Sequence, residues 1–371
     1  MFYILLTYLL SPVVYIWLFL HKRNDIKRIL VVQTAKIGDM ICTTPVFREI
    51  KKKYPYVHLT VLINPVTRGV LENNPHIDEI TAIWHTDIKG FAGKMELSRL
   101  IRKGKYDVAV CLNPNIPYVV ALFWGMVPLR VSVMPDYVGG TFRLASNLFT
   151  HLEKHIRGSM VIETYMQMLK HIGIKSNYIS KEIYRSEGSD EKVQQILGSI
   201  GKPLIGIGVS SGNKMKELGK EKIVGLIDLL LESMDSYIVL IGSGQDLNAA
   251  GSISDAVAKK EYIINATGKL SLAELPALIE RLSLFIGVDS GITYMADSLS
   301  IPLIDIAGPS DMQDLRPVGN DAIILQKKLK CVPCSHAFKA PYECQRRDRA
   351  CIESVSIEEI CDVAIKMISG R

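Results

Sequence analysis

The stretch Gly287-Val-Asp-Ser-Gly-Ile-Thr-Tyr-Met-Ala-Asp-Ser-Leu-Ser-Ile-Pro302 decides how this chain folds. It begins at the end of an apolar run, residues 282–287, which predicts a buried parallel strand. Residues 292–299 predict a short helix that ends before the proline, and the apolar run 303–307 predicts the next strand. The result is a strand–helix–strand unit, and open α/β sheets bind ligands at the carboxyl ends of such strands.

The turn Asp289-Ser290-Gly291 lies at this end of the first strand. Ser290 can cap the helix while the amide of Gly291 stays open. The turn then offers backbone N–H groups and the positive end of a helix dipole to an anion, and a diphosphate is the expected ligand. An ordinary turn that binds no ligand is the alternative.

The same alternation of apolar strands and helices extends over the chain of 371 residues, which is long enough for two ordinary domains. One series starts at Ile29, and a second starts at Pro203 after a polar stretch. The predicted fold class is α/β, with two Rossmann-like doubly wound domains facing a central cleft. The predicted boundaries are a membrane anchor at 1–21, an N-terminal Rossmann-like domain at 22–185, a C-terminal Rossmann-like domain at 186–353 and a C-terminal helix at 354–371.

Residues 2–20 carry no charge and are almost wholly apolar. No basic segment precedes them and no Ala-x-Ala site follows, so a cleaved signal peptide fits poorly. At about 1.5 Å per residue they barely cross a bilayer core of about 30 Å, and Pro12 lies mid-run. We therefore expect a spanning or re-entrant membrane anchor. The basic residues at 21–28 then stay on the cytoplasmic side, against an anionic membrane surface of the cell inner membrane.

Charge and motifs exclude several functions. The net charge is +6, but the basic residues are scattered without interleaved aromatic residues, so nucleic acid is not an expected partner. Gly242-Ser-Gly244 lacks the third glycine of a dinucleotide fingerprint, and no P-loop is present. There is also no Asp-x-Asp pair of the kind that holds a metal-bound nucleotide sugar. A bound diphosphate would be neutralised by lysine and a helix dipole, so no cofactor is required for catalysis.

Four of the seven cysteines are clustered near the C-terminal end of the chain. Four thiols at this spacing predict a structural zinc or iron–sulfur site. Reduced thiols, or disulfides that staple a loop, remain the alternatives. The cluster consists of Cys331, Cys334, Cys344 and Cys351.

Two further loops converge with Asp289 on the predicted switch point of the second domain. The basic loop Ser210-Ser-Gly-Asn-Lys-Met-Lys216 follows a predicted strand, and either of its lysines, Lys214 or Lys216, supplies a cation for a diphosphate. Gln245 and Asp246 follow the next strand, where a ribose acceptor is expected.

In four segments the chain resembles the ADP-heptose:lipopolysaccharide heptosyltransferase family (glycosyltransferase family 9), which has GT-B architecture. The resemblance implies a metal-independent, inverting transfer of a sugar from a nucleotide-diphospho-sugar, ADP-linked, to a sugar hydroxyl. It further implies heptose as the sugar and a lipid-linked or cell-envelope glycan, such as lipopolysaccharide core, as the acceptor. The segments are 29–48, 206–216, 239–246, and 268–275 with its continuation through 287–291 to 308–311.

The resemblance also implies that 22–185 is the acceptor domain and that 186–353, with the cysteine cluster, is the nucleotide-sugar domain. It further implies roles for single residues. Asp39 matches the catalytic base, which must lie within hydrogen-bond reach of the acceptor hydroxyl. Lys216, with Lys214 second, matches the lysine on the donor phosphates, and Asp289 matches a donor-sugar contact. Gly268 is expected next to the base. The whole predicted donor-binding set is Lys216, Lys214, Ser210, Ser211, Asp246, Gly268, Asp289, Ser290 and Gly291.

Three departures from the family pattern bear on which sugar is transferred. Tyr294 stands where the family has a histidine, Lys216-Glu-Leu replaces an Arg-Trp-Pro, and Ala35-Lys36 replaces a pair of serines. Two other functions stay open at this point. One is a GT-B-like sugar-nucleotide epimerase, and the other is a membrane protein that binds a sugar nucleotide without catalysis.

Overall fold

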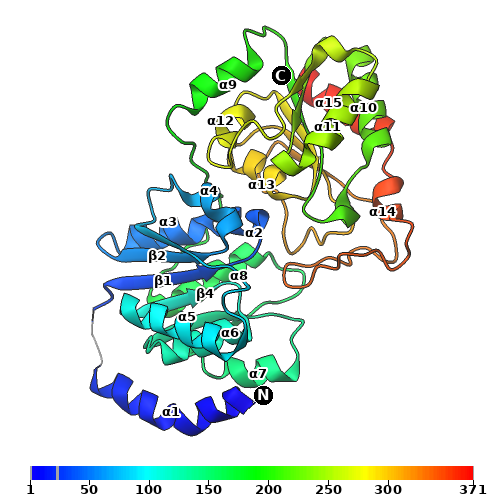
Figure 1. The fold of residues 1–371 in the computed structure, drawn as a ribbon. Coiled ribbons are helices and arrows are strands. Elements are labelled where there is room, and N and C mark those ends of the chain that lie inside the picture. Colours follow the sequence, from blue (N-terminus) through cyan, green and yellow to red (C-terminus); the bar gives the residue numbers. More distant parts are fainter. Residues whose placement is uncertain (1, 22–24, 371) are drawn as a thin grey trace. The chain divides into compact units, whose positions relative to one another are not determined.

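The computed structural model describes residues 2–21 and 25–370, and the chain divides into two compact units (Figure 1). The N-terminal unit is Met1–Ile179 and the C-terminal unit is Ser180–Arg371, so the division falls just before the boundary predicted at residue 185. Each unit contains a six-stranded parallel sheet with helices on its faces.

The sheet of the N-terminal unit has the strand order β3-β2-β1-β4-β5-β6, with every neighbouring pair parallel. The order reverses between β1 and β4, which is the switch point of a doubly wound sheet. The central strands β1 and β4 are mostly apolar runs because both of their faces are buried. The strands are β1 (Arg28–Gln33), β2 (His58–Ile63), β3 (Glu79–Ala82), β4 (Val108–Cys111), β5 (Leu129–Met134) and β6 (His151–Lys154).

Short helices and 3-10 turns connect these strands. Helix α3 has Thr43 as its N-cap residue, and Thr44 already lies in the helix. The elements are α2 (Ile37–Ile41), α3 (Thr44–Lys53), η1 (Pro65–Thr67), α4 (Arg68–Leu71), α5 (Gly90–Gly104), α6 (Ile116–Trp124), α7 (Gly140–Ser146), α8 (Val161–Met168) and η2 (Leu169–Ile172).

The N-terminal apolar segment forms one continuous helix, α1 (Phe2–Leu20), which runs through Pro12 without a hairpin. It buries Ile4 and Val14 in the same apolar cluster as α6, and the indole of Trp124 donates to Thr7 Oγ1 at 3.0 Å. No helix among residues 2–21 and 25–370 is long and apolar enough to cross a membrane. The prediction of a spanning or re-entrant anchor is therefore corrected: α1 packs as a helix on the N-terminal unit.

The sheet of the C-terminal unit repeats the same topology, with the order β12-β11-β10-β7-β8-β9. Its switch point lies between β7 and β10, which pair in parallel with Leu284 opposite Ile205. The strands are β7 (Leu204–Gly208), β8 (Tyr237–Ile241), β9 (Ile263–Asn265), β10 (Leu284–Val288), β11 (Leu303–Ile306) and β12 (Ala322–Leu325).

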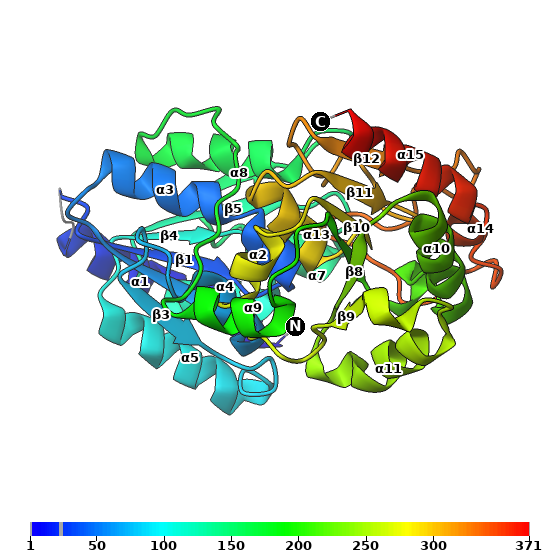
Figure 2. The same ribbon diagram turned by 90° about the horizontal axis from the view of Figure 1, so that it is seen from above.

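The C-terminal helix α15 (Ile357–Ser369) packs beside α10 (Lys220–Ser233) in the core of this unit, as Figure 2 shows. Ile360, Cys361 and Ala364 of α15 are buried in that core, so the helix is an integral part of the unit. The remaining elements are α9 (Ser189–Leu197), η3 (Lys214–Lys216), η4 (Gly244–Asp246), α11 (Leu247–Ala256), η5 (Lys260–Tyr262), α12 (Leu275–Ile279), α13 (Gly291–Ser298) and α14 (Ala350–Glu353).

A buried ion pair fixes the first residues of the C-terminal unit to its helix α13. Lys181 Nζ donates to Asp297 Oδ2 at 2.6 Å, and both side chains are almost fully buried. The other carboxylate oxygen of Asp297 accepts from the backbone amides of Val318 and Gly319. A charge pair taken out of water depends on such additional hydrogen bonds, so each partner holds the other in place.

Candidate functional site

Asp289 is the centre of a polar cluster at the carboxyl end of β10, at the switch point of the C-terminal sheet. Its Oδ2 accepts hydrogen bonds from Lys216 Nζ and Ser310 Oγ, each at 2.5 Å, and its Oδ1 accepts from the hydroxyl of Tyr294 at 2.7 Å. Three loops or helices that are distant in sequence thus meet at one buried carboxylate.

The pKa of Asp289 is set by two opposing causes. Burial raises the pKa, while the charge and hydrogen bond of Lys216 and the hydroxyls of Ser310 and Tyr294 lower it. The net pKa lies below the ordinary value for an aspartate, so Asp289 is ionised and Lys216 is its counter-charge. Lys216 is therefore directed toward the switch point, as the sequence predicts.

Helix α13 begins at Gly291, with Ser290 as its N-cap residue. The Ser290 side chain makes no capping hydrogen bond and instead lies 3.4 Å from the hydroxyl of Thr293. The prediction that Ser290 occupies the cap position is confirmed, but the serine does not cap the helix through its side chain. The first-turn amides thus keep their affinity for an anion next to the positive charge of Lys216.

The two lysines of the loop after β7 have different surroundings. Lys214 is 79% exposed, and its Nζ donates to Glu217 Oε1 at 2.8 Å. This hydrogen bond raises the pKa of Lys214. The same Glu217 oxygen accepts from the backbone amide of Ser211, so Glu217 organises the loop. Only Lys216 reaches Asp289, and this distinguishes two lysines that the sequence left nearly equivalent.

Asp246 and Gly268 shape the loop after β8. Burial raises the pKa of Asp246, but hydrogen bonds from Ser243 and Ser210 lower it by more, so the carboxylate is ionised and lies beside the loop after β7. Asp246 also accepts from the amide and hydroxyl of Ser243, which makes it a cap of η4. Gly268 has φ of +69°, and a Cβ there would lie 3.1 Å from Gly244 Cα. Gly268 therefore allows close packing against this loop, and its expected position next to Asp39 stays a prediction.

Asp305 of β11 lies beneath this cluster and was not singled out from the sequence. Neither of its carboxylate oxygens has a hydrogen-bond partner. Burial, followed by the negative charge of Asp289, raises its pKa well above the ordinary value. Asp305 is thus a neutral carboxylic acid at a pH where Asp289 is ionised, and it adds no negative charge against an incoming diphosphate.

Asp39, the predicted catalytic base, lies in helix α2 after β1, at the switch point of the N-terminal sheet. Its Oδ2 accepts from the backbone amide of Lys36 at 3.2 Å, so the carboxylate also caps the start of α2. Burial, and then the charge of Asp39, raises the pKa of Tyr165, which places the carboxylate near a buried phenol. Asp39 thus has a structural contact of its own, and its role as base stays a prediction.

The four clustered cysteines form no disulfide in the structure and lie between β12 and the end of α14. Burial raises the pKa of Cys351, and the charges of the other three thiols raise it further. Burial and the charges of Cys331 and Cys344 do the same for the pKa of Cys334. The structure therefore brings the predicted ligand set into one neighbourhood.

Cys344 differs from the other clustered thiols. Burial raises its pKa, but three backbone amides, those of residues 349, 346 and 347, lower it by more. Amides directed at a sulfur stabilise a thiolate, which is the form that binds a metal. In a tetrahedral site with metal–sulfur bonds of about 2.3 Å, the sulfurs lie about 3.8 Å apart. The donor set fits a metal, but within the described chain no three cysteine sulfurs lie within 4.8 Å of one another.

The group of potential ligands that does meet this distance, within the described residues, is Asp311, Asp314 and His336. His336 Nδ1 lies 2.9 Å from Asp311 Oδ2 and 3.5 Å from Asp314 Oδ2. These contacts already pair the carboxylates with the imidazole. We therefore interpret the group as a charge network that joins the loop after β11 to the cysteine segment, residues 331–351.

The cysteine segment contacts the loop after β7 and the loop after β11. The amides of Cys334 and Ser335 each donate to the carbonyl of Pro309 at 3.0 Å, next to Ser310 of the Asp289 cluster. On the other side, Asn213 Nδ2 donates to the Pro341 carbonyl at 2.9 Å. Arg349 Nη1 donates to the carbonyl of Lys214 at 3.0 Å. The segment thus supports the loops that carry Lys216 and Ser310.

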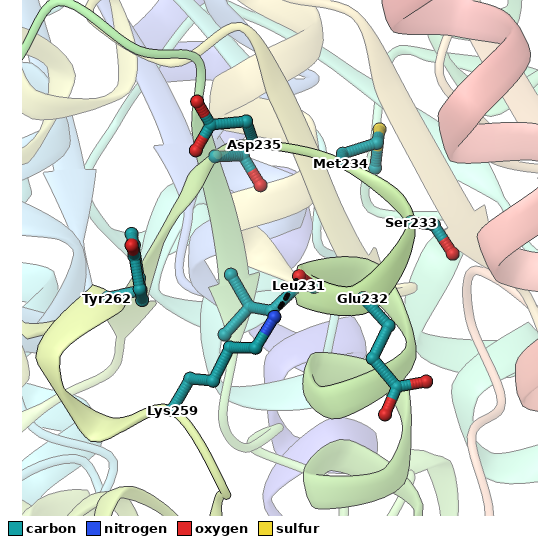
Figure 3. Close-up of a pocket in the computed structure, with 8 residues that line it drawn as sticks. Leu231, Glu232, Ser233, Met234, Asp235, Lys259 and Tyr262 are labelled. Atoms are coloured by element: carbon teal, nitrogen blue, oxygen red, sulfur yellow. Dashed lines mark hydrogen bonds between the residues drawn. The ribbon is translucent and has the colours of Figure 1, made fainter.

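A separate hollow of about 290 Å³ lies at the other end of the sheet, between the end of α10 and the start of β8 (Figure 3). Its wall includes Met234, Asp235 and Tyr262, and Lys259 donates across it to the carbonyl of Leu231 at 2.8 Å. The hollow lies at the amino ends of the strands and contains none of the predicted donor residues. We assign it no part in donor binding.

A profile of glycosyltransferase family 9, the heptosyltransferases, matches residues 92–343. The chain belongs to this family. It is a glycosyltransferase of the heptosyltransferase type, as the sequence predicts. Lipopolysaccharide heptosyltransferase 3 of Escherichia coli is 28% identical over 293 residues, which cover 77% of this chain and 85% of that protein. Lipopolysaccharide heptosyltransferase 1 of Campylobacter coli is 23% identical over 360 residues, or 90% and 96% of the two chains.

Solved heptosyltransferase structures share the fold. A family 9 glycosyltransferase from Veillonella parvula DSM 2008 has a TM-score of 0.76 at 24% identity and covers 94% of this chain and 99% of its own. The E. coli ADP-heptose lps heptosyltransferase II has a TM-score of 0.72 at 18% identity, with 92% and 99% covered. The predicted α/β fold with two parallel sheets, which GT-B heptosyltransferases also have, is confirmed.

The polar cluster around Asp289 contains two residues that were not predicted as donor contacts. Tyr294 and Ser310 both hydrogen-bond Asp289. Tyr294 could have been found, because it replaces the family histidine one helical turn after the Asp289 turn. Ser310 lies in a predicted loop, but its partner lies on another strand, and no local pattern links the two.

Proposed function

We propose that this heptosyltransferase transfers a sugar, heptose, from an ADP-linked donor to a lipopolysaccharide-core or other lipid-linked acceptor, with inversion and without a metal ion in the chemical step. The relatives bear the names of lipopolysaccharide heptosyltransferases, and one similar structure is an E. coli heptosyltransferase with ADP. We place the reaction at the cytoplasmic face of the cell inner membrane, where such an acceptor is accessible to a nucleotide sugar.

The observation that carries this proposal is the cluster of Lys216, Asp289, Tyr294 and Ser310 beside the first turn of α13. As the bond to the sugar breaks, negative charge accumulates on the departing diphosphate. Fixed N–H groups and a lysine directed at that position stabilise the transition state without reorganisation. In this mechanism Lys216 is shared between Asp289 and the phosphates, and Asp289 contacts the donor sugar.

Asp39 completes the proposed reaction as the general base. Its carboxylate accepts the proton of the acceptor hydroxyl while the oxygen attacks the anomeric carbon, and the carbon–oxygen bond to the diphosphate breaks on the opposite side. The products are the glycosylated acceptor with inverted configuration, ADP and the protonated Asp39. Both switch points contribute one function each: the C-terminal one holds the donor, and the N-terminal one activates the acceptor.

The proposed donor is tested by thermal shift with ADP-, UDP- and GDP-linked sugars, followed by a transfer assay with a lipopolysaccharide-core acceptor. We expect ADP-heptose to stabilise the protein most and to yield product with the acceptor. Greater stabilisation by a UDP- or GDP-sugar would contradict the donor assignment. A changed sugar configuration without any acceptor would indicate the epimerase alternative.

Lys216→Ala should weaken ADP binding by about 1–3 kcal/mol, because a charge-assisted hydrogen bond to phosphate is lost. Isothermal titration calorimetry with ADP measures this loss. Lys214→Ala is the matched control, since its side chain is exposed and already paired with Glu217. Lys216→Ala leaves the buried carboxylate of Asp289 without its counter-charge. The double variant Lys216→Ala/Asp289→Asn also removes that negative charge, so it separates the loss of the lysine contact from the effect of an uncompensated carboxylate. A larger loss of affinity in Lys214→Ala than in Lys216→Ala would transfer the role to Lys214.

We also propose that the cysteine segment binds a zinc ion or an iron–sulfur cluster through Cys331, Cys334, Cys344 and Cys351. The donor set and the three amides at Cys344 support this, and a structural neighbour, TibC of enterotoxigenic E. coli H10407, is an iron-containing glycosyltransferase with a TM-score of 0.57. A bound metal would hold the four thiolates together. Its proposed role is structural, because the cysteine segment contacts the loops that carry Lys216 and Ser310.

Elemental analysis of protein purified without oxygen should find zinc or iron, and Cys344→Ser should lose most of it. We expect the same variant to bind ADP several-fold more weakly, since the segment contacts Lys214 and Pro309. Cys361→Ser, at a buried cysteine of α15 outside the cluster, should retain both the metal and the ADP affinity. Metal-free protein that binds ADP normally would contradict the proposal.

A further inference from the structure

Helix α1 presents an apolar face to the exterior of the N-terminal unit. The helix has no charged residue from Phe2 to Leu20. On one side, spaced at three or four positions, large side chains are exposed, including Leu9 (75%), Val13 (67%) and Leu20 (71%). We call this side the outer face, and it consists of Leu5, Leu9, Val13, Ile16 and Leu20.

The opposite side of α1 holds the helix to the unit. Ile4 and Val14 are buried, and Thr7 accepts the hydrogen bond of the Trp124 indole. Tyr8 donates through its hydroxyl to the carbonyl of Leu144 in α7, which lies beside α1 in Figure 1. The helix is therefore fixed along its length, and its orientation determines that the outer face points away from the unit.

An apolar face of this kind is expected to contact another apolar surface or a lipid membrane. A helix that is apolar all around is ordinarily buried on all sides, because water does not hydrate such a surface favourably. Contiguous exposed apolar surface on a folded protein marks a site of interaction with a protein or a membrane. Nothing within the described part of the chain covers these five side chains, since each remains exposed in the complete fold.

We propose that the outer face of α1 inserts into the surface of a lipid bilayer, with the helix axis parallel to the membrane plane. A protein interface has a polar rim and forms hydrogen bonds across it. The outer face has no polar side chain, and hydrocarbon is the medium that requires none. A helix docked on a globular unit reaches only the boundary between headgroups and acyl chains, at a depth of about 5–10 Å.

The borders of the outer face match this boundary. Trp17, close to the C-terminal end of α1, is partly exposed, and such aromatic residues favour the headgroup level. The next residues of the sequence, 21–28, include four lysines or arginines, of which Lys27 is exposed. Arg143 of α7, also exposed, follows Phe142 and directly precedes the residue that accepts the Tyr8 hydrogen bond. Positive charge at the edge of an apolar face favours a bilayer with anionic headgroups.

This surface is independent of the proposed function, but one consequence rests on it. The N-terminal unit carries the proposed base Asp39, and an in-plane α1 brings that unit to the membrane where a lipid-linked acceptor lies. Binding to vesicles is measured without donor or acceptor. A failure of the membrane surface is therefore distinguishable from a failure of the transferase assignment.

The test is flotation of the full chain with vesicles of phosphatidylethanolamine and phosphatidylglycerol. We expect wild-type protein to float with the vesicles, and the triple variant Leu9→Glu/Val13→Glu/Ile16→Glu to lose at least about tenfold in partitioning, because buried apolar area dominates such binding. Its melting temperature should not change, since these side chains are exposed. The control triple variant Tyr56→Glu/Leu247→Glu/Tyr342→Glu replaces exposed apolar residues elsewhere and should float like wild type.

A second measurement keeps the fold intact. In the Trp84→Phe background, brominated acyl chains in the vesicles should quench the fluorescence of Trp17, and the further change Trp17→Phe should remove that quenching. The proposal is overturned if the triple Glu variant floats like wild type, or if Trp17 is not quenched. It is also overturned if the triple variant changes from a dimer to a monomer in the absence of lipid, which would identify a second copy of the chain as the cover.

Discussion

Asp39→Asn should reduce sugar transfer by about 10²–10⁴-fold, the range that a positioned general base contributes. The amide oxygen of asparagine still accepts the hydrogen bond from the Lys36 amide, so the cap of α2 is retained. What is lost is the ability to take a proton at neutral pH. Steady-state kinetics with donor and acceptor measures the effect, and ADP binding should stay within a few-fold of wild type.

Asp87→Asn is a matched control for this variant. The Asp87 carboxylate accepts from the backbone amide of Trp84, three residues earlier, at 3.0 Å, just as Asp39 accepts from Lys36 at 3.2 Å. Asp87→Asn therefore removes the same charge at a comparable helix cap, and Asp87 has no predicted role in transfer. The turnover of this variant should equal that of the wild-type enzyme. Unchanged turnover in Asp39→Asn would remove Asp39 from the mechanism and leave it with its structural role alone.

Lys181→Met should lower the free energy of unfolding by about 3–5 kcal/mol, because it leaves the buried carboxylate of Asp297 without its counter-charge. Two backbone amides still contact that carboxylate, but they do not neutralise it. The loss is measured by urea denaturation. Lys181→Met/Asp297→Asn should recover much of the stability, since no unpaired charge then remains in the core.

The exposed pair of Lys202 and Asp235 has the same nitrogen–oxygen distance of 2.6 Å and serves as the control. Lys202→Met should leave the stability nearly unchanged, because water solvates both charges after the pair is broken. If Lys181→Met and Lys202→Met behaved alike, burial would not be the cause of the effect. The comparison thus separates the contribution of burial from that of the contact distance.

The strands that the sequence predicted well are those buried on both faces. The runs before Asp289 and after Pro302 became β10 and β11 within two residues of the predicted bounds, because a continuous apolar run is a direct consequence of a strand with helices on both sides. Two of the four edge strands, β6 and β12, were not predicted. β6 (His151–Lys154) is a mostly polar segment whose residues are exposed or half-buried, so its sequence lacks the apolar run.

The polar cluster at Asp289 was predictable in those residues that directly follow strands, and it was not predictable in the side-chain pairings. Asp289, Ser290 and Lys216 could be expected near one another because parallel strands place their following loops at one edge of the sheet. The choice of Lys216 over Lys214 depended on a 3-10 turn, η3, that directs one side chain inward and leaves the other to Glu217. Asp305 was missed, since an aspartate within an apolar strand gives no local sign of its surroundings.

The amino-acid sequence by itself determines three features: the order of the apolar strands, the turns with small residues and the absence of charge in α1. It does so because burial on two faces and tight turns restrict the residue types locally. Those patterns suffice for the two doubly wound sheets, the family and the loops that carry the site. Only the tertiary structure decides that Asp289 pairs with Lys216, that Asp305 stays neutral beneath it, and that α1 packs along the N-terminal unit. These outcomes depend on contacts between residues far apart in the chain, and the free energy of a charge or an apolar face is set by what surrounds it in space.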